Sequence, residues 1–352
     1  MLDKFLLDTF GNELIKDLII PIPLFAFVVV FALYAVLAER KISAFMQNRP
    51  GPNRVGGRTG VLQVVADALK LLQKEMVLPF RADKLLYNVA PFVVFTGTLL
   101  GYAIIPFSSI YVGVDLNIGL FYFFAVTSIS VIGMLMGGWA SNNKYSLYGS
   151  MRSVAQIVSY EIPTALAALN VVMLAGTLSM QKFSELQAGG IQNWFVMGGP
   201  GGLSKVIIIP FMVAAALILF ISTLAEANRT PFDIVEADSE IVAGVHLEYA
   251  GMQMVMFMFA EYAQMFAVSG VLVTLFFGGW QSPFGDAIPF LNTPWMQFAW
   301  FIGKGLFFVF VMIWLRWTLP RLRVDQLMHL CWKYLIPISL VIIFVIGFYL
   351  VV

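Results

Sequence analysis

Long apolar stretches alternate with shorter polar segments along almost the whole chain. A transmembrane helix needs about 20 predominantly apolar residues. Eight stretches meet this length, at about residues 20–38, 86–106, 118–139, 154–177, 206–225, 249–277, 296–315 and 335–352. Pro91, Pro163 and Pro210 lie inside them, where proline is tolerated if neighbours satisfy the carbonyls it leaves free. The pattern predicts an all-α polytopic membrane protein with eight transmembrane helices, in one integral membrane domain spanning residues 1–352.

Two other segments have an amphipathic pattern. From Val61 onward, apolar residues alternate at helical spacing with polar ones, which predicts an amphipathic helix at the cytoplasmic membrane surface. Prolines and glycines between residues 50 and 60 exclude a long helix just before it. The first 20 residues contain scattered acids, unlike a signal peptide, and suggest a short helix lying at the membrane interface.

The charged residues support this topology and orient it. Only 12% of the residues are charged, against about 25% in soluble domains. Lys and Arg favour cytoplasmic loops. Sixteen of the 21 lie in the odd-numbered loops, nine of them in the loop 39–85, and only four lie on the other side. Both termini are therefore expected outside. No basic stripe with interleaved aromatics indicates nucleic-acid binding.

Carboxylates crowd into one segment that runs from the end of one apolar stretch into the next. Seven of the chain's 20 acids are Glu226, Asp233, Glu236, Asp238, Glu240, Glu248 and Glu261, and Arg229 is the only base among them. An eighth acid, Glu161, lies inside another apolar stretch. Ionisable groups at membrane depth cost about 2.5–3.5 kcal/mol each on insertion scales. Neighbouring buried carboxylates share protons, so the cluster favours a role in proton transfer.

Two other interpretations of these acids stay open. If the segment is helical, Glu236 and Glu240 are four residues apart on one face that also holds Asp233. Asp233–Glu240 could equally be a solvated cytoplasmic loop. Buried acids are also used structurally, and here they would pair with Arg229 or Arg152.

The chain is poorly equipped to hold a redox centre. It has one cysteine, Cys331, and two distant histidines, His246 and His329. A thiolate-bound iron–sulfur cluster needs several cysteines. The sequence therefore predicts no metal site and assigns no catalytic residue.

Several motifs resemble one family. They are Glu39-Arg40-Lys41, Gln47-Asn48-Arg49, Gly51-Pro52-Asn53, the runs 146–161 and 224–249, Ala260-Glu261-Tyr262 and Asp325-Gln326-Leu327. Together they resemble the membrane subunit of respiratory complex I, the NADH:quinone oxidoreductase, that is called subunit 1 in mitochondria and has a bacterial counterpart. Pro50 and His246 depart from residues common in that family, and Asp238 stands where relatives often carry Glu.

The resemblance implies a role beside quinone. Residues matching Arg40, Arg49, Asp67 and Lys70 lie near the entrance of the family's quinone chamber, and the matching acids link that chamber to antiporter-like subunits. Quinone would be the substrate, while FMN and iron–sulfur clusters would lie in partner subunits. The expected partners are hydrophilic quinone-site subunits, small membrane subunits, antiporter-like subunits and lipid. The expected location is the bacterial inner membrane, or an organelle inner membrane.

Two rival functions remain at this point. A membrane anchor of an energy-converting hydrogenase would share the family's ancestry without using quinone, but the first-loop match argues against it. A free-standing ion-coupled transporter would predict two repeated halves with broken helices, and no internal repeat is visible.

Overall fold

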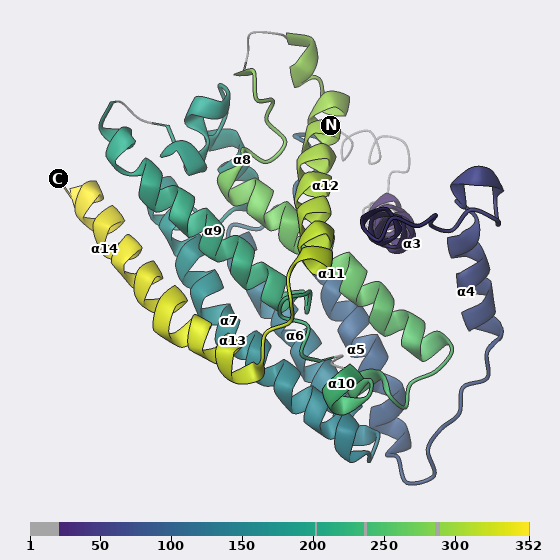
Figure 1. Cartoon of the computed structure of the whole chain (residues 1–352). Helices are drawn as coiled ribbons and strands as arrows, with labels where there is room; N and C mark the ends of the chain where they lie inside the picture. Colours follow the sequence, from purple (N-terminus) through teal and green to yellow (C-terminus); the bar gives the residue numbers. More distant parts are fainter. Residues whose placement is uncertain (1–20, 201–202, 236–237, 286–288, 352) are drawn as a thin grey trace, which may run out of the picture.

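The computed structural model describes residues 21–200, 203–235, 238–285 and 289–351, which form helices and no strand (Figure 1). Eight helical segments are long and apolar enough to span a membrane: α3 (Pro21–Met46), α5 (Lys84–Tyr102), α6 (Gly119–Ala140), α7 (Lys144–Ala175), α9 (Ile209–Glu226), α11 (Met252–Phe276), α12 (Pro294–Thr318) and Val324–Val351. The last consists of α13 (Val324–Leu330), a π-helical turn (Cys331–Leu335) and α14 (Ile336–Val351). The prediction of an all-α protein with eight such helices is confirmed.

Shorter helices connect these spans. They are α4 (Gln63–Gln73), α8 (Met180–Leu186) and α10 (Asp238–Ile241). The predicted amphipathic helix is α4, which buries Val64 and leaves Val65, Leu69 and Leu72 exposed. It contacts α3 and the central helix α11 at the edge of the bundle (Figure 1). The other predicted amphipathic helix, in residues 1–20, lies outside the described residues.

Helices α3 and α7 are two of the spans that extend further than their apolar stretches. The predicted first loop began at residue 39, but α3 continues to Met46, so Glu39 and Arg40 lie on a helix. Helix α7 starts at Lys144, where the Asn143 side chain accepts a hydrogen bond from the backbone N–H of Tyr145 at 3.0 Å. Hydropathy detects the apolar part of a helix only, so polar helical turns at either end escape it.

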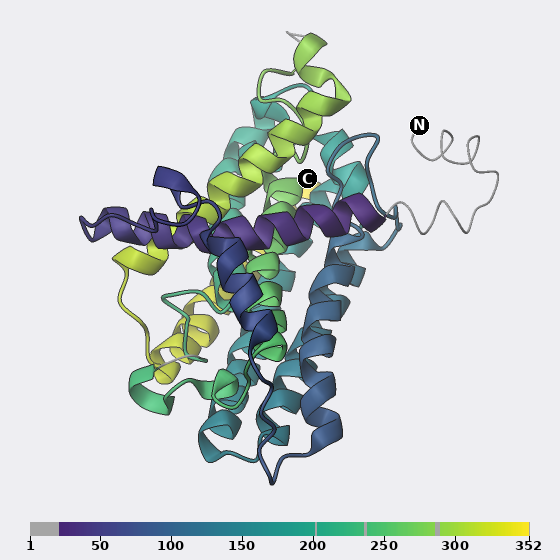
Figure 2. The same cartoon turned by 90° about the vertical axis from the view of Figure 1, so that its right-hand side faces the viewer.

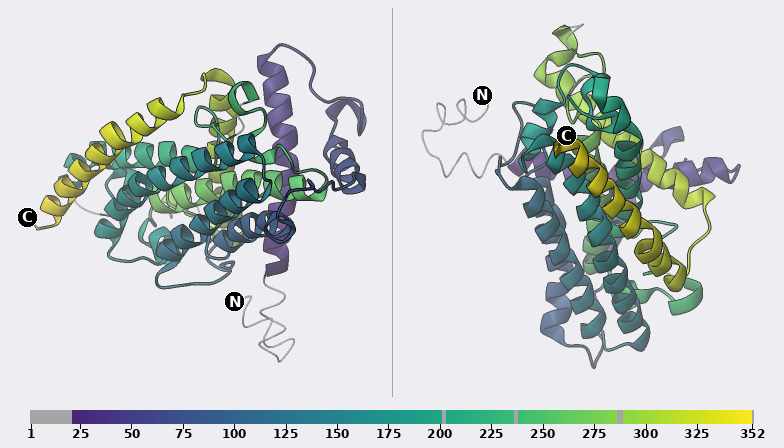
Figure 3. Two further views of the ribbon diagram at one scale, coloured as in Figure 1. Left: turned by 90° about the horizontal axis from the view of Figure 1, so that it is seen from below. Right: turned by 90° about the vertical axis from the view of Figure 1, so that its left-hand side faces the viewer.

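The long helices pack around α11, the most deeply buried of the eight. Helix α6 lies between α5 and α7, while α11 contacts α5, α9 and α12. Helix α14 packs on the outside of α7 (Figure 3). Helix α3 runs crosswise to the others over α11 and α12 (Figure 2). Because of this crossing, the last turns of α3 carry Glu39 and Arg40 to the face of the bundle.

Side chains from distant segments satisfy the carbonyls that two helix-interior prolines leave free. Pro91 cannot donate to the carbonyl of Tyr87, which accepts a hydrogen bond from the Tyr249 hydroxyl at 3.3 Å. Pro163 likewise frees the Ser159 carbonyl, which accepts from the Cys331 thiol at 3.1 Å. Pro210 lies in the first turn of α9, where a proline costs no helical hydrogen bond.

We expect Tyr249→Phe to destabilise the subunit, because it removes the hydroxyl that the Tyr87 and Gly137 carbonyls share as a hydrogen-bond donor. One such hydrogen bond is worth about 1 kcal/mol. The fraction of intact complex that survives heating, measured on native gels, should fall. Tyr148→Phe is the control, because Tyr148 is exposed. Equal heat resistance of the two variants would contradict the assignment.

Candidate functional site

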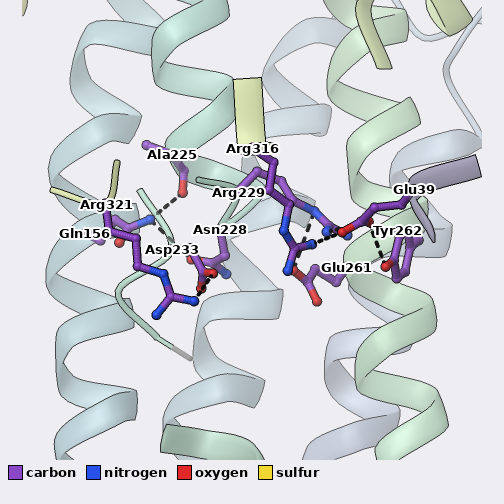
Figure 4. A network of polar contacts seen from close by, with 10 residues as sticks. All are labelled: Glu39, Gln156, Ala225, Asn228, Arg229, Asp233, Glu261, Tyr262, Arg316 and Arg321. Atoms are coloured by element: carbon purple, nitrogen blue, oxygen red, sulfur yellow. Dashed lines mark hydrogen bonds and ion pairs between the residues drawn. The ribbon is translucent and has the colours of Figure 1, made fainter. Parts of the chain in front are cut away.

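A buried polar network joins α3, α11, α12 and the segment after α9 (Figure 4). Its centre is Glu39 on α3, which is only 6% exposed. One carboxylate oxygen accepts hydrogen bonds from the Tyr262 hydroxyl at 2.8 Å and from Arg229 Nη1 at 3.2 Å. The other oxygen pairs with Arg316 of α12. A single carboxylate thus ties together four parts of the chain.

Arg229 is the most deeply buried charge of this network, with 2% of its side chain exposed. Its Nε lies 3.6 Å from Glu261 Oε1, and its guanidinium lies over the Tyr262 ring at 4.3 Å from the ring centroid. Burial alone would lower the pKa of Arg229, but the carboxylates of Glu261 and Glu39 raise it above its ordinary value. Arg229 therefore stays charged, and two carboxylates balance two arginines.

Arginines from distant segments also form ion pairs with other acids of the predicted proton-transfer group. Asp233 is buried and lies 3.1 Å from Arg321 Nη2, and exposed Glu240 pairs with Arg152. The local sequence, with Arg229 as the only base among the acids, indicated a shortage of basic partners. That interpretation was wrong, because α7, α12 and the segment after α12 supply arginines. Glu261 lies beside Arg229, as the alternative of structural pairing predicted for buried acids, whereas the acid that pairs with Arg152 is the exposed Glu240.

A second group of acids has neutral hydrogen-bond partners. Glu161 Oε1 accepts from Ser128 Oγ at 2.6 Å. Glu226 Oε1 accepts from Gln264 Nε2 at 3.2 Å, and Glu248 Oε1 accepts from Asn143 Nδ2 at 2.7 Å. Among the described residues, none of these three carboxylates forms an ion pair with Lys or Arg. A neutral partner leaves both protonation states within reach, whereas an arginine favours the charged form alone.

A small cavity connects the two groups. Its volume is about 30 Å³, and Glu226, Glu261, Asn228, His246 and Gln264 contribute to its lining. A water molecule needs roughly 10–15 Å³ and two to four polar partners. The cavity therefore has room and hydrogen-bonding groups for one or two waters between the carboxylates of Glu226 and Glu261.

The acids between residues 233 and 240 do not lie on one helix face. Asp233 lies in an irregular segment, and α10 begins only at Asp238. The condition for a face shared by Asp233 and Glu240 is therefore not met, because Asp233 does not lie on a helix. Glu236 and the side chain of Asp238 lie outside the described residues.

The residues predicted near quinone are only partly brought together. Arg40 pairs with Asp67, which joins the end of α3 to α4, and Gln63 Nε2 also donates to Asp67 at 3.0 Å. Arg49 follows α3 and donates to Gln47 Oε1 at 2.6 Å. Lys70 is exposed on α4. Asp67 is the partner of Arg40, and among the described residues neither Arg49 nor Lys70 forms an ion pair with it.

The sequence interpretation missed Glu39, Tyr262 and Arg316 as site residues, although Glu39 and Tyr262 lie in the quoted motifs. The available signal was an acid within the last turns of an apolar run, at Glu39. The signal was overlooked because the loop was expected to begin at that residue.

Comparisons with known proteins agree on one family. The family model described as NADH dehydrogenase matches residues 19–347. The chain is 52% identical to a Chlorobaculum parvum protein over 333 residues, which are 92% of this chain and 89% of that protein. It is 46% identical to a Geobacillus kaustophilus protein over 319 residues, or 90% and 89% of the two chains. The names of both relatives describe them as one and the same subunit of NADH-quinone oxidoreductase.

We expect Glu39→Gln to prevent normal accumulation of the subunit in the membrane. It leaves two arginines facing one carboxylate, and breaking a buried ion pair costs about 3–5 kcal/mol. Glu75→Gln is the control, since Glu75 is exposed. Adding Arg316→Gln to Glu39→Gln restores neutrality and should recover part of the protein, measured by immunoblotting of membranes. Parental levels and parental heat resistance of the single variant would refute the central role of Glu39.

Proposed function

This chain belongs to the NADH dehydrogenase family, and we propose that it builds the membrane side of a quinone site and links quinone reduction to proton transfer. As a member of that family it is a membrane subunit of an NADH:quinone oxidoreductase. The observation that best supports the proposal is the position of Glu226, which has a neutral hydrogen-bond partner and lines a small cavity together with Glu261 of the Glu39–Arg229 network.

The proton-transfer part uses the two groups of acids differently. Glu161, Glu226 and Glu248 take up and release protons, because their neutral partners accept either protonation state. Asp233, Glu240 and Glu261 lie beside arginines and contribute to the local electric field. Glu236 and Asp238 belong to the same proposed route on the evidence of the sequence.

The quinone part uses the junction of α3 and α4. The Arg40–Asp67 ion pair lies at this junction, and α4 also exposes the apolar side chains of Leu69 and Leu72. Charged groups at the edge of an apolar surface would orient the polar quinone head group while the tail stays in lipid. Arg49 and Lys70 add positive charge nearby on the same two segments.

The proposed function requires partner subunits to supply the redox groups, the rest of the quinone chamber and the rest of the proton route. FMN and iron–sulfur clusters would lie in other subunits, and hydrophilic quinone-site subunits would close the chamber. Small membrane subunits and antiporter-like subunits would continue the proton route, and lipid would surround the spans. The relatives named above are bacterial, so we place this chain in a bacterial inner membrane. Their names also favour a quinone oxidoreductase over the hydrogenase anchor and the transporter.

Both termini are proposed to face outward, with the loops containing Arg54, Tyr145, Asp233 and Arg323 in the cytoplasm. Single cysteines introduced at Arg54, Tyr145, Arg323 and, for the loop that contains buried Asp233, exposed Glu240 should resist a membrane-impermeant thiol reagent added to intact cells and should react after the cells are opened. A cysteine at Gln192 should react in intact cells. Labelling of any of the four from outside would overturn this orientation.

For the quinone site, we expect Asp67→Ala or Arg49→Ala to raise the apparent KM for quinone or to lower quinone reductase activity. NADH oxidation with a hydrophilic artificial acceptor should be unchanged, because that reaction does not use the membrane chamber. The folding cost is small because exposed ion pairs contribute only about 0–1 kcal/mol. Arg81→Ala changes an exposed charge elsewhere in the segment and serves as control. A parallel loss of both activities would point to failed assembly and remove support for the site.

For proton transfer, we expect Glu161→Gln to lower proton-pumping quinone reduction about tenfold or more, since glutamine keeps the shape but cannot ionise. Glu161→Asp should retain a good part of the activity, and exposed Glu185→Gln should retain all of it. The measurement is turnover and pH-gradient formation in proteoliposomes, with assembly checked on native gels. An assembled Glu161→Gln variant that pumps at the parental rate would rule out the role of Glu161.

A further inference from the structure

Ser128 on α6 has two hydrogen-bond acceptors but only one proton to donate. Its Oγ lies 2.6 Å from Glu161 Oε1 and 2.9 Å from the backbone carbonyl of Phe124. A serine hydroxyl donates one hydrogen bond and has two acceptor lone pairs. It therefore cannot donate to the carboxylate and to the carbonyl at the same time.

The protonation of Glu161 decides which of the two acceptors is used. When Glu161 is ionised, it can only accept, and Ser128 donates to the carboxylate. When Glu161 carries a proton, the carboxyl donates to Ser128 Oγ, and the serine proton turns to the Phe124 carbonyl. The same atoms remain hydrogen-bonded in both states without any movement of α6 or α7.

Two other hydroxyls on the spanning helices lack this choice. Ser269 on α11 and Thr164 on α7 donate to the carbonyl four residues earlier in their own helix, at 2.7 Å in both cases. Such bonds within the helix are usual for serine and threonine. Thr127, the neighbour of Ser128, donates to the same Phe124 carbonyl at 3.1 Å and lies beside the Glu226 carboxylate. Two adjacent hydroxyls thus face the two acids that α7 and α9 contribute.

We propose that Ser128 is a positioning residue that holds the Glu161 carboxyl in one place in both protonation states, by reversing the direction of their hydrogen bond. The proposal rests on the proposed proton-transfer role of Glu161. Without Ser128, the ionised carboxylate loses its donor and the protonated carboxyl loses its acceptor, so each proton exchange requires the side chain to find new partners.

Ser128→Ala in the intact complex tests this directly. We expect about tenfold slower proton-coupled quinone reduction, the factor that corresponds to loss of one hydrogen bond to a charged group. Infrared difference spectroscopy should also show the protonated-carboxyl band of Glu161, identified by its absence in Glu161→Gln, shifted to higher frequency. Ser128→Thr keeps the hydroxyl and should restore both readouts. Ser269→Ala should change neither, because its hydroxyl contacts no acid.

The outcomes separate this inference from the function on which it rests. An unchanged band and parental turnover in Ser128→Ala, with Glu161→Gln inactive, would overturn the role of Ser128 alone. Parental pumping by Glu161→Gln would instead overturn the proton-transfer function. If Ser128→Ala does not assemble, Ser128→Cys takes its place, since the thiol is a weaker donor and acceptor and should shift the same band.

Discussion

The charge of Arg229 is the constraint on which the other features of this structure depend. A guanidinium that is 2% exposed inside an apolar bundle must be balanced by carboxylates. Glu261 on α11 supplies one of them and Glu39 supplies the other, although Glu39 lies on the first helix of the described chain. The crosswise path of α3 over α11 and α12 brings Glu39 to this position, and Arg316 then completes a neutral set of four charges.

The same balance divides the acids into two kinds. Carboxylates beside arginines interact with a fixed positive charge, and the proposed function gives them a structural and electrostatic contribution. Glu161, Glu226 and Glu248 have serine, glutamine and asparagine as partners instead. The cavity between Glu226 and Glu261 lies where the two kinds meet. The proposed quinone binding beside α3 and α4 would change the charge network and would act first on Glu226. The proposed coupling between quinone reduction and proton transfer therefore has a physical location at this cavity.

The sequence predicted the spans well because hydrophobicity accumulates over about 20 local residues. It did not predict the polar first turns of α7 or the last turns of α3, since these lie at helical ends that hydropathy misses. The resemblance pointed to Arg40 and Asp67, which do pair. The sequence could not predict the partners of the acids. Arg321 lies 88 residues from Asp233 along the chain, and Arg152 lies 88 residues from Glu240. Only the fold brings such residues together.

The distinction between the two kinds of acid is the central claim, and one comparison tests it most directly. Glu226→Gln and Glu240→Gln make the same chemical change at a carboxylate with a neutral partner and at one paired with Arg152. The measurement is the number of protons pumped per NADH oxidised by each assembled variant in proteoliposomes. We predict that Glu226→Gln loses pumping and that Glu240→Gln keeps the parental ratio. Normal pumping by Glu226→Gln, with loss of pumping in Glu240→Gln, would contradict the account.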